Sequence, residues 1–143
     1  MTETRPLHNG LFSWPDDHPE LLGSRCDSCG EHAFPAQDSC RSCTGAQTTV
    51  VGMGREGVLW TWTIQSFMPK DPYHTDETPE TFVPYGVGYV ELTNGLRVES
   101  RLRENTPDTL RIGMSMQLEI IPVRTTEDGA QLVTFQFRAR EAQ

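Results

Sequence analysis

Four cysteines are the residues of this chain whose type and spacing can do chemistry. They form two Cys-x-x-Cys pairs with ten residues between them: Cys26, Cys29, Cys40 and Cys43. Such pairs place four thiolates at the corners of a tetrahedron, each about 2.3 Å from a zinc ion. Gly30 directly follows the first pair, and glycine adopts the tight turn needed under a metal without steric cost. The spacing therefore predicts one structural zinc ion bound by all four cysteines.

Disulfides, a redox-active Cys-x-x-Cys pair and an iron centre are the alternative uses of these cysteines. The amino-terminal sequence MTETRPLHNG has no apolar stretch typical of a secretory signal, which disfavours disulfides. Iron would use the same four sulfurs and would give a red protein. Because four thiolates complete the tetrahedron and leave no position for water or substrate, the zinc site is interpreted as structural. His32, between the pairs, is interpreted as a loop residue.

Composition narrows the class of protein. The chain has 143 residues, with 12 Lys and Arg residues against 20 Asp and Glu residues and a formal net charge of −8. This length suits one domain, or a small module attached to one. The acidic balance argues against a protein that binds nucleic-acid phosphates, and no apolar run approaches the ~20 residues that span a bilayer. We therefore expect a cytoplasmic protein without a membrane or nucleic-acid partner.

The region before the cysteines is expected to contain a short helix. Ser13 or Asp17 is a suitable helix cap, and Gly23 is a suitable stop. Four apolar side chains are many for so short a segment: Phe12, Trp14, Leu21 and Leu22. They either pack on the following domain or offer a surface to a partner, and both interpretations stay open. Residues 1–24 are thus expected as an N-terminal segment, and residues 25–47 as a rubredoxin-like zinc ribbon.

Alternation of apolar and polar residues begins near Val50 and predicts β-strands. With a lead-in over 50–53, the expected strands are 58–65, 87–92, 96–103, 116–120 and 133–138. Asn94-Gly95 predicts a two-residue type I′ hairpin turn, and residues 107–110 predict one helical turn. The fold class is therefore mainly β, with a five-stranded OB-fold barrel over residues 48–143. An SH3-like barrel or a sandwich is the alternative.

Two features of this barrel bear on function. Trp60 and Trp62 alternate with threonines and are predicted on the core face of their strand. Residues 66–84 form a long loop with four prolines, whose apolar ends are expected to be pinned to the barrel and whose acidic middle is expected to be solvated. The loop is interpreted as a lid or docking arm, against the alternative of an excursion without function.

Several motifs together resemble a known family. They are CDSCG and CRSC in the ribbon, GMGREGVLWTWT over 52–63, VPYGVGYVEL over 83–92 and LRIGM over 110–114. The chain from Trp14 to about Phe137 is similar to the zinc-ribbon plus OB-fold proteins encoded beside acyl-CoA thiolases. Such proteins often carry a Pro-Pro-Arg run in the ribbon loop, whereas this chain reads FPAQ over 34–37.

The resemblance implies a non-catalytic accessory subunit. Its partner would be a thiolase-like enzyme or a lipid-transfer-protein-type aldolase, such as those acting on steroid side-chain acyl-CoA thioesters, in a heterotetramer by analogy with dimeric thiolases. The ribbon and the preceding segment would dock on the partner, and the barrel would lie near the acyl-CoA site. The residues agree, because no nucleophile, base or nucleotide-binding motif is found and no catalytic residue is predicted.

Candidate contacts with the partner or with acyl-CoA are drawn from the apolar segment, the long loop and the arginines. They are Phe12, Trp14, Leu21, Leu22, Phe67, Pro84, Tyr85, Arg97 and Arg101. Arg97 and Arg101 share a strand face with Glu99, so cross-strand ion pairs are the alternative to binding phosphates or partner carboxylates. The second functional hypothesis is a single-stranded nucleic-acid-binding OB domain, with these aromatic platforms: Trp60, Trp62, Phe67 and Tyr85.

Overall fold

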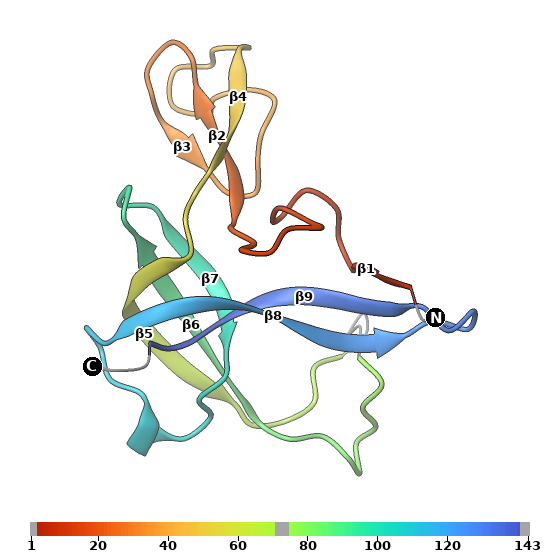
Figure 1. Ribbon diagram of the computed structural model, residues 1–143. Coiled ribbons are helices and arrows are strands. Elements are labelled where there is room, and N and C mark those ends of the chain that lie inside the picture. The colour runs from red at the N-terminus through yellow and green to blue at the C-terminus, as the bar shows by residue number, and fades with distance from the viewer. Residues whose placement is uncertain (1–2, 71–74, 141–143) are drawn as a thin grey trace.

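The chain folds into a small three-stranded sheet above a β-barrel (Figure 1). The computed structural model describes residues 3–70 and 75–140. The small sheet contains β2 (Leu22–Cys26), β3 (His32–Ala33) and β4 (Thr48–Gly52). The other elements are β1 (Thr4–Pro6), β5 (Glu56–Gln65), β6 (Tyr85–Leu92), β7 (Arg97–Leu102), the 3-10 helix η1 (Pro107–Thr109), β8 (Ser115–Thr125) and β9 (Gln131–Ala139).

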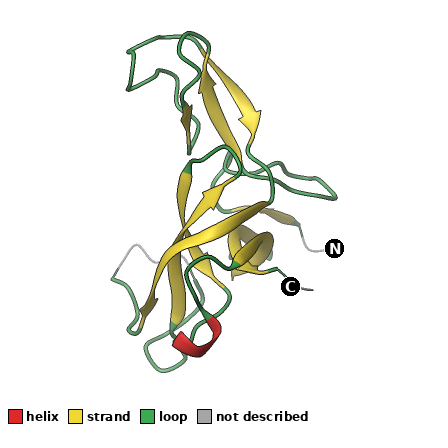
Figure 2. Cartoon of the chain, turned by 90° about the vertical axis from the view of Figure 1, so that its left-hand side faces the viewer, coloured by secondary structure: helices red, strands yellow, loops and turns green. Residues whose placement is uncertain are grey.

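Strands β5 to β9 form the predicted closed five-stranded barrel. Strands β5, β6 and β7 are joined by antiparallel pairing, β5 also pairs with β8, and β8 pairs with β9. A parallel pair between Leu102 and Phe137 joins β7 to β9 and closes the ring. Closure removes the unpaired strand edges that an open sheet would expose. The single helical turn η1 lies between β7 and β8, as expected, and is the red element in Figure 2.

A β-bulge in β5 makes the prediction for Trp60 wrong. Leu59 pairs with Val90 and Thr61 pairs with Tyr89, so Trp60 is the extra residue on its strand. An extra residue shifts the inward and outward alternation by one position. Leu59 is therefore fully buried and Trp60 is 46% exposed, whereas Trp62 beyond the bulge packs against the core.

The hairpin between β6 and β7 lies where Asn94-Gly95 predicts it, but its geometry differs. Gly95 has a φ of 88° and its N–H donates to the Leu92 carbonyl at 2.9 Å. Among the described residues Thr44 is the only non-glycine residue with positive φ, so Asn94 does not adopt the left-handed conformation that a type I′ turn requires. The connection is a three-residue loop with a left-handed glycine at its end.

Two glycines on the inner side of β6 let the barrel wall close tightly. A Cβ atom on Gly88 would lie 2.5 Å from the Thr61 carbonyl oxygen and 2.9 Å from Leu59 Cδ1. A Cβ on Gly86 would lie 2.3 Å from the Glu104 carbonyl oxygen. Backbone oxygens cannot move aside as the end of a flexible side chain can, so both positions require glycine.

Replacing Gly88 by alanine should therefore destabilise the barrel. Overpacking of a closed core costs about 1–3 kcal/mol, and we expect the free energy of unfolding in urea to fall by about 2 kcal/mol or more. Thr63→Ala is the matched control, because Thr63 is an exposed residue on neighbouring β5. If both variants unfolded at the same urea concentration, the conclusion that Gly88 is required for close packing of the barrel wall would be wrong.

The predicted N-terminal helix is wrong, and η1 is the only helix in the described residues. Residues 11–21 instead form a loop in which the Ser13 N–H donates to the Glu20 carbonyl at 2.9 Å. The Ser13 hydroxyl accepts a hydrogen bond from the Glu20 N–H at 3.0 Å, so it closes this loop rather than capping a helix. Pro15 and Pro19 also oppose a helix here, because proline disfavours helical backbone in the residue before it. No helix in the described part of the chain is long and apolar enough to cross a membrane.

Strand β4 is expected as the lead-in to the barrel, and it belongs to the ribbon instead. It pairs with β2 from Leu22↔Gly52 to Cys26↔Thr48. Val50 on β4 is 62% exposed, so the alternation that suggests a barrel strand does not face the barrel core. The ribbon sheet thus draws residues from both sides of 25–47, and the predicted domain boundaries stay a prediction.

The ribbon and the barrel share one hydrophobic core. Leu21 and Met53, which flank the ribbon strands, are 0% and 4% exposed and belong to the same buried cluster as the barrel residues. Phe34 in the ribbon meets Phe135 of β9 edge to face, with ring centroids 5.8 Å apart. This continuity fixes how the metal-binding end is held against the barrel.

The long loop is attached partly by polar contacts and partly through Phe82, whose ring meets the Tyr85 ring of β6 edge to face with centroids 6.0 Å apart. Phe67 is 74% exposed and Val83 is 57% exposed, so the expectation that these two are pinned is wrong. The Asp76 carboxylate, from the acidic middle, instead accepts a hydrogen bond from the Thr125 N–H at 3.0 Å. Residues 71–74 of the loop lie outside the described residues.

Candidate metal centre and docking face

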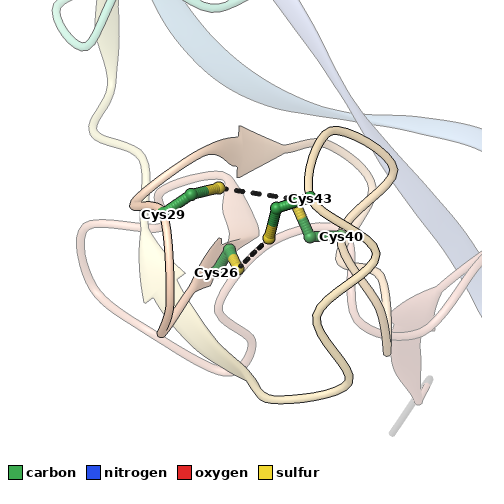
Figure 3. A group of neighbouring side chains, drawn as sticks. All are labelled: Cys26, Cys29, Cys40 and Cys43. Carbon is green, nitrogen blue, oxygen red and sulfur yellow. Dashed lines mark hydrogen bonds between the residues drawn. The ribbon is translucent and has the colours of Figure 1, made fainter.

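The four cysteines predicted as ligands converge at one end of the ribbon. Their sulfur atoms all lie within 4.8 Å of one another. Cys26 and Cys43 sulfurs are 3.5 Å apart, and Cys29 and Cys40 sulfurs are 3.6 Å apart (Figure 3). A tetrahedron with zinc–sulfur bonds of about 2.3 Å has edges of about 3.8 Å. The two sulfur pairs are close to that edge length, so the cluster suits a zinc ion, and all four thiols are free rather than paired as disulfides.

Two tight turns bring the sulfurs together. The Gly30 N–H donates to the Cys26 carbonyl at 2.9 Å, and Gly30 has a φ of 80°. Thr44 occupies the corresponding position after the second pair and has a φ of 60°, an uncommon conformation for a β-branched residue. Gly45 then follows, where a Cβ atom would lie 3.3 Å from the Cys43 sulfur. The ribbon loop thus accepts local strain in order to bring the second pair under the metal position.

Backbone amides favour thiolates at two of the ligands. Hydrogen bonds from the N–H groups of Cys29 and Ser28 lower the pKa of Cys26 to about 6. Equivalent bonds from Cys43 and Ser42 lower the pKa of Cys40. Four thiolates on one divalent ion carry a net charge of −2, and aligned amide dipoles stabilise that charge.

The other two ligands show the opposite shift in the metal-free cluster. The Glu31 N–H acts to lower the pKa of Cys29, but hydrogen bonds with the neighbouring thiols outweigh it and raise that pKa to about 12. The Gly45 N–H acts to lower the pKa of Cys43, but hydrogen bonds with Cys26 and Cys40 together with desolvation outweigh it, so that this pKa is also raised. Four sulfurs this close cannot all carry charge without a cation between them, which is what a metal ion provides.

Comparison with known proteins agrees with this geometry. The rubredoxin-like zinc ribbon domain of ChsH2 matches residues 13–50, and the C-terminal OB-fold domain of ChsH2 matches residues 50–120. The benzoylsuccinyl-CoA thiolase subunit BbsA of Thauera aromatica is 32% identical over 134 residues, covering 92% of this chain and 86% of that protein. The chain belongs to the ChsH2 family.

Other similar proteins include a scaffold protein and an aldolase complex as well as the thiolase subunit. A DUF35 domain-containing scaffold protein of Methanocaldococcus jannaschii is 29% identical over 110 residues, covering 76% of this chain and 72% of that one. The solved Ltp2-ChsH2(DUF35) aldolase superposes with a TM-score of 0.63 at 24% identity and covers 84% of both chains. That likeness confirms the fold. The zinc ribbon of the family and the four converging sulfurs together make this a four-cysteine site for one structural zinc ion.

Two of the predicted contact residues of this ChsH2-family chain are buried. Phe12 and Leu21 pair in an isolated antiparallel bridge and are 4% and 0% exposed, so they belong to the core and not to a docking surface. Leu21 also belongs to the buried cluster that contains the barrel residues, which favours packing on the domain for this residue. Trp14, which meets Phe12 edge to face at 6.1 Å, is half-buried, as is Leu22.

The structure gathers other candidates on the outer side of three neighbouring strands. We name this surface the β5–β7 face, and it contains Trp60, Tyr85, Tyr89, Arg97 and Arg101. Trp60 and Tyr89 meet edge to face with centroids 6.3 Å apart. The Arg97 guanidinium lies 4.0 Å from the centre of the Trp60 ring, and that of Arg101 lies 4.1 Å from the centre of the Tyr85 ring.

Sequence reasoning assigns parts of this face and misses others. Arg97 also forms an ion pair with Glu91 on the neighbouring strand, at 3.1 Å, of the kind given above as the alternative to ligand binding. Trp60 is predicted in the core, and Tyr89, 41% exposed, is not among the predicted contacts. For Tyr89 the missing signal is the spacing of Gly86 and Gly88, because both face the crowded inner side of β6 and alternation then places Tyr89 on the outer side.

Proposed function

We propose that this protein is a non-catalytic accessory subunit that binds a thiolase-like or lipid-transfer-protein-type aldolase partner. The observation that carries the proposal is its membership of the ChsH2 family, whose domains match residues 13–120, together with a relative that is a thiolase subunit. The metal site supports a structural role, because four cysteines leave zinc no open coordination position. The partner carries the chemistry.

The β5–β7 face is the docking surface in this proposal. Tryptophan, tyrosine and arginine are the residues that most often dominate protein interfaces. Here two arginine side chains already lie over aromatic rings before any partner binds, which lowers the entropy lost on binding. The half-buried Trp14 and Leu22, together with the exposed Phe67 and Pro84, are further candidate contacts.

The stoichiometry, the location and the substrate class in this proposal follow from the resemblance to accessory subunits of acyl-CoA thiolases. The assembly would be a heterotetramer of two partner subunits and two copies of this chain, in the cytoplasm, where four thiols stay reduced. The partner would act on an acyl-CoA thioester, such as a steroid side-chain derivative, and the barrel would help form or gate that site. We assign such gating to the loop 66–84, which Asp76 ties to the end of β8 and Phe82 to β6.

Co-expression tests the proposal. The full chain, with a thiolase-like protein from the same organism, should elute as one complex, and cleavage or condensation of acyl-CoA should fall at least about tenfold when this chain is omitted. Metal analysis of the complex should give one zinc per copy of this chain. A partner that reaches full turnover alone, or this chain turning over thioesters unaided, would refute an accessory role.

The same preparation tests the nucleic-acid alternative. Exposed Trp60 and Tyr89 resemble a base-stacking platform, but Glu91 and Glu99 lie on the same face and the formal net charge is −8. Oligonucleotide binding that weakens steeply with salt would favour that alternative.

A further inference from the structure

A pocket of about 460 Å³ lies where the N-terminal loop crosses the barrel, apart from both the zinc site and the β5–β7 face. We name it the arginine pocket. Its charged lining residues are Asp16, Arg55, Arg103, Glu119 and Arg138, and Trp14 and Pro19 are among its less polar walls. Pockets of roughly 300–1,000 Å³ hold small organic ligands. The volume thus suits a ligand larger than a single water or ion.

Two of the three arginines are already paired inside the protein. Arg103 lies 2.9 Å and Arg138 lies 3.4 Å from the same Glu119 oxygen. The second oxygen of Glu119 accepts a hydrogen bond from Gln136 Nε2 at 2.5 Å. One carboxylate therefore balances two guanidinium groups, and both of its oxygens are used.

Arg55 has no such partner. Its Nη1 atom lies 3.3 Å from His18 Nδ1, and its Nε atom is buried without a hydrogen-bond partner. No carboxylate lies within ion-pair distance of Arg55 among the described residues. Asp16, the other acid of the pocket, accepts a hydrogen bond from the His18 N–H at 2.9 Å, and the Arg55 charge is only the last of the causes that lower its pKa. A partly buried guanidinium without a bound anion is costly, so this site is incomplete as it stands.

We propose that the arginine pocket binds the carboxylate or phosphate group of a small organic anion, with Arg55 as its principal donor. Three guanidinium groups face two carboxylates there, which leaves a local charge of +1 in an otherwise acidic chain. The planar fork of arginine matches the oxygens of either group. The Trp14 ring beside it provides a surface for an apolar or planar ligand body. The proposal concerns the isolated chain and does not depend on the accessory function.

Calorimetric titration of the full zinc-loaded chain tests it, with inorganic phosphate in one arm and acetate in the other. Ionic strength is held constant with sodium chloride. We expect saturable binding of one anion per chain, accompanied by a change in Trp14 fluorescence. Arg55→Gln should weaken binding by about tenfold or more, because a charge-assisted hydrogen bond is lost. Arg111→Gln is the matched control, since Arg111 is an exposed arginine outside the pocket.

The two arms also identify the group. Tighter binding of phosphate assigns a phosphate ligand, and tighter binding of acetate assigns a carboxylate. Trp14→Phe should abolish the fluorescence change while calorimetric binding persists. If Arg55→Gln does not fold, Arg103→Gln provides the second test, because the Arg103 side chain is 58% exposed, and it should weaken binding severalfold. No saturable binding in either arm, or wild-type affinity in a folded arginine variant, would overturn the proposal.

Discussion

Replacing Cys40 by serine should abolish zinc binding and unfold the ribbon. Cys40 is one of two buried ligands, and its sulfur lies 3.6 Å from that of Cys29. Structural zinc is worth on the order of 10 kcal/mol or more of folding free energy at neutral pH. The ribbon has little to replace it, because only Ser24, Cys26 and Cys40 are buried between residues 24 and 47. Metal analysis should fall from one zinc per chain to nearly none, and amide resonances of ribbon residues such as Gly30 should collapse to unfolded positions.

Ser39→Ala provides the control for this loss. Ser39 is exposed and adjacent to Cys40, so the variant should keep one zinc and a folded ribbon. The barrel of the Cys40→Ser variant should remain folded but less stable, because Leu21 and Met53 leave the shared core when the ribbon unfolds. A metal-free Cys40→Ser chain with an intact ribbon spectrum would contradict a structural metal, and so would wild-type protein isolated with cystines.

The cysteine site could be predicted because the ligands are close in sequence and their chemistry is specific. Cys26 and Cys29 need only one turn to reach the same ion, and the second pair repeats it. The barrel strands were also predictable, since alternation reports which side of a strand faces a core. Val98, Ser100 and Leu102 are all buried, and the residues between them point outward, as expected.

The failures share a physical cause, which is that tertiary contacts override local pattern. The prediction for Trp60 assumes that apolar and polar residues alternate along β5 without interruption. Trp60 is instead an extra residue opposite Val90 and Tyr89, and its side chain therefore lies on the outer side of the barrel. Ser13 is a suitable cap by type, and yet its hydroxyl is used by Glu20, seven residues later. No spacing rule predicts which of these partners is closer in space.

The arginine pocket and the β5–β7 face lay beyond sequence reasoning for a similar reason. Arg55, Arg103 and Arg138 come from different parts of the chain and meet only after β8 and β9 pair. Arg97 reaches Trp60 across the intervening strand β6, because both side chains point to the same outer side. Predicting a site that is assembled from three or more segments requires knowing how the strands pair, and the sequence alone does not determine that register.

Replacing Trp60 by alanine should weaken binding of the thiolase-like partner more than any other single change on the β5–β7 face. Trp60 combines 46% exposure with contacts to both Tyr89 and Arg97, so its loss removes one ring from the surface and the support of two neighbours. Truncation of such a residue typically costs about 2 kcal/mol or more, which is about a thirtyfold loss of affinity. The free energy of unfolding should change little, because the side chain lies outside the barrel core.

Val50→Ala discriminates between this face and the ribbon as the docking surface. Val50 is 62% exposed on β4 and belongs to the ribbon sheet, so its truncation should leave the dissociation constant of the complex unchanged. Affinity measured by interferometry on zinc-loaded, folded variants separates the two surfaces. Loss of affinity in Val50→Ala with none in Trp60→Ala would move docking to the ribbon and leave the β5–β7 face without a partner. Loss in Trp60→Ala alone identifies Trp60, with the Tyr89 and Arg97 side chains that it contacts, as part of the docking surface.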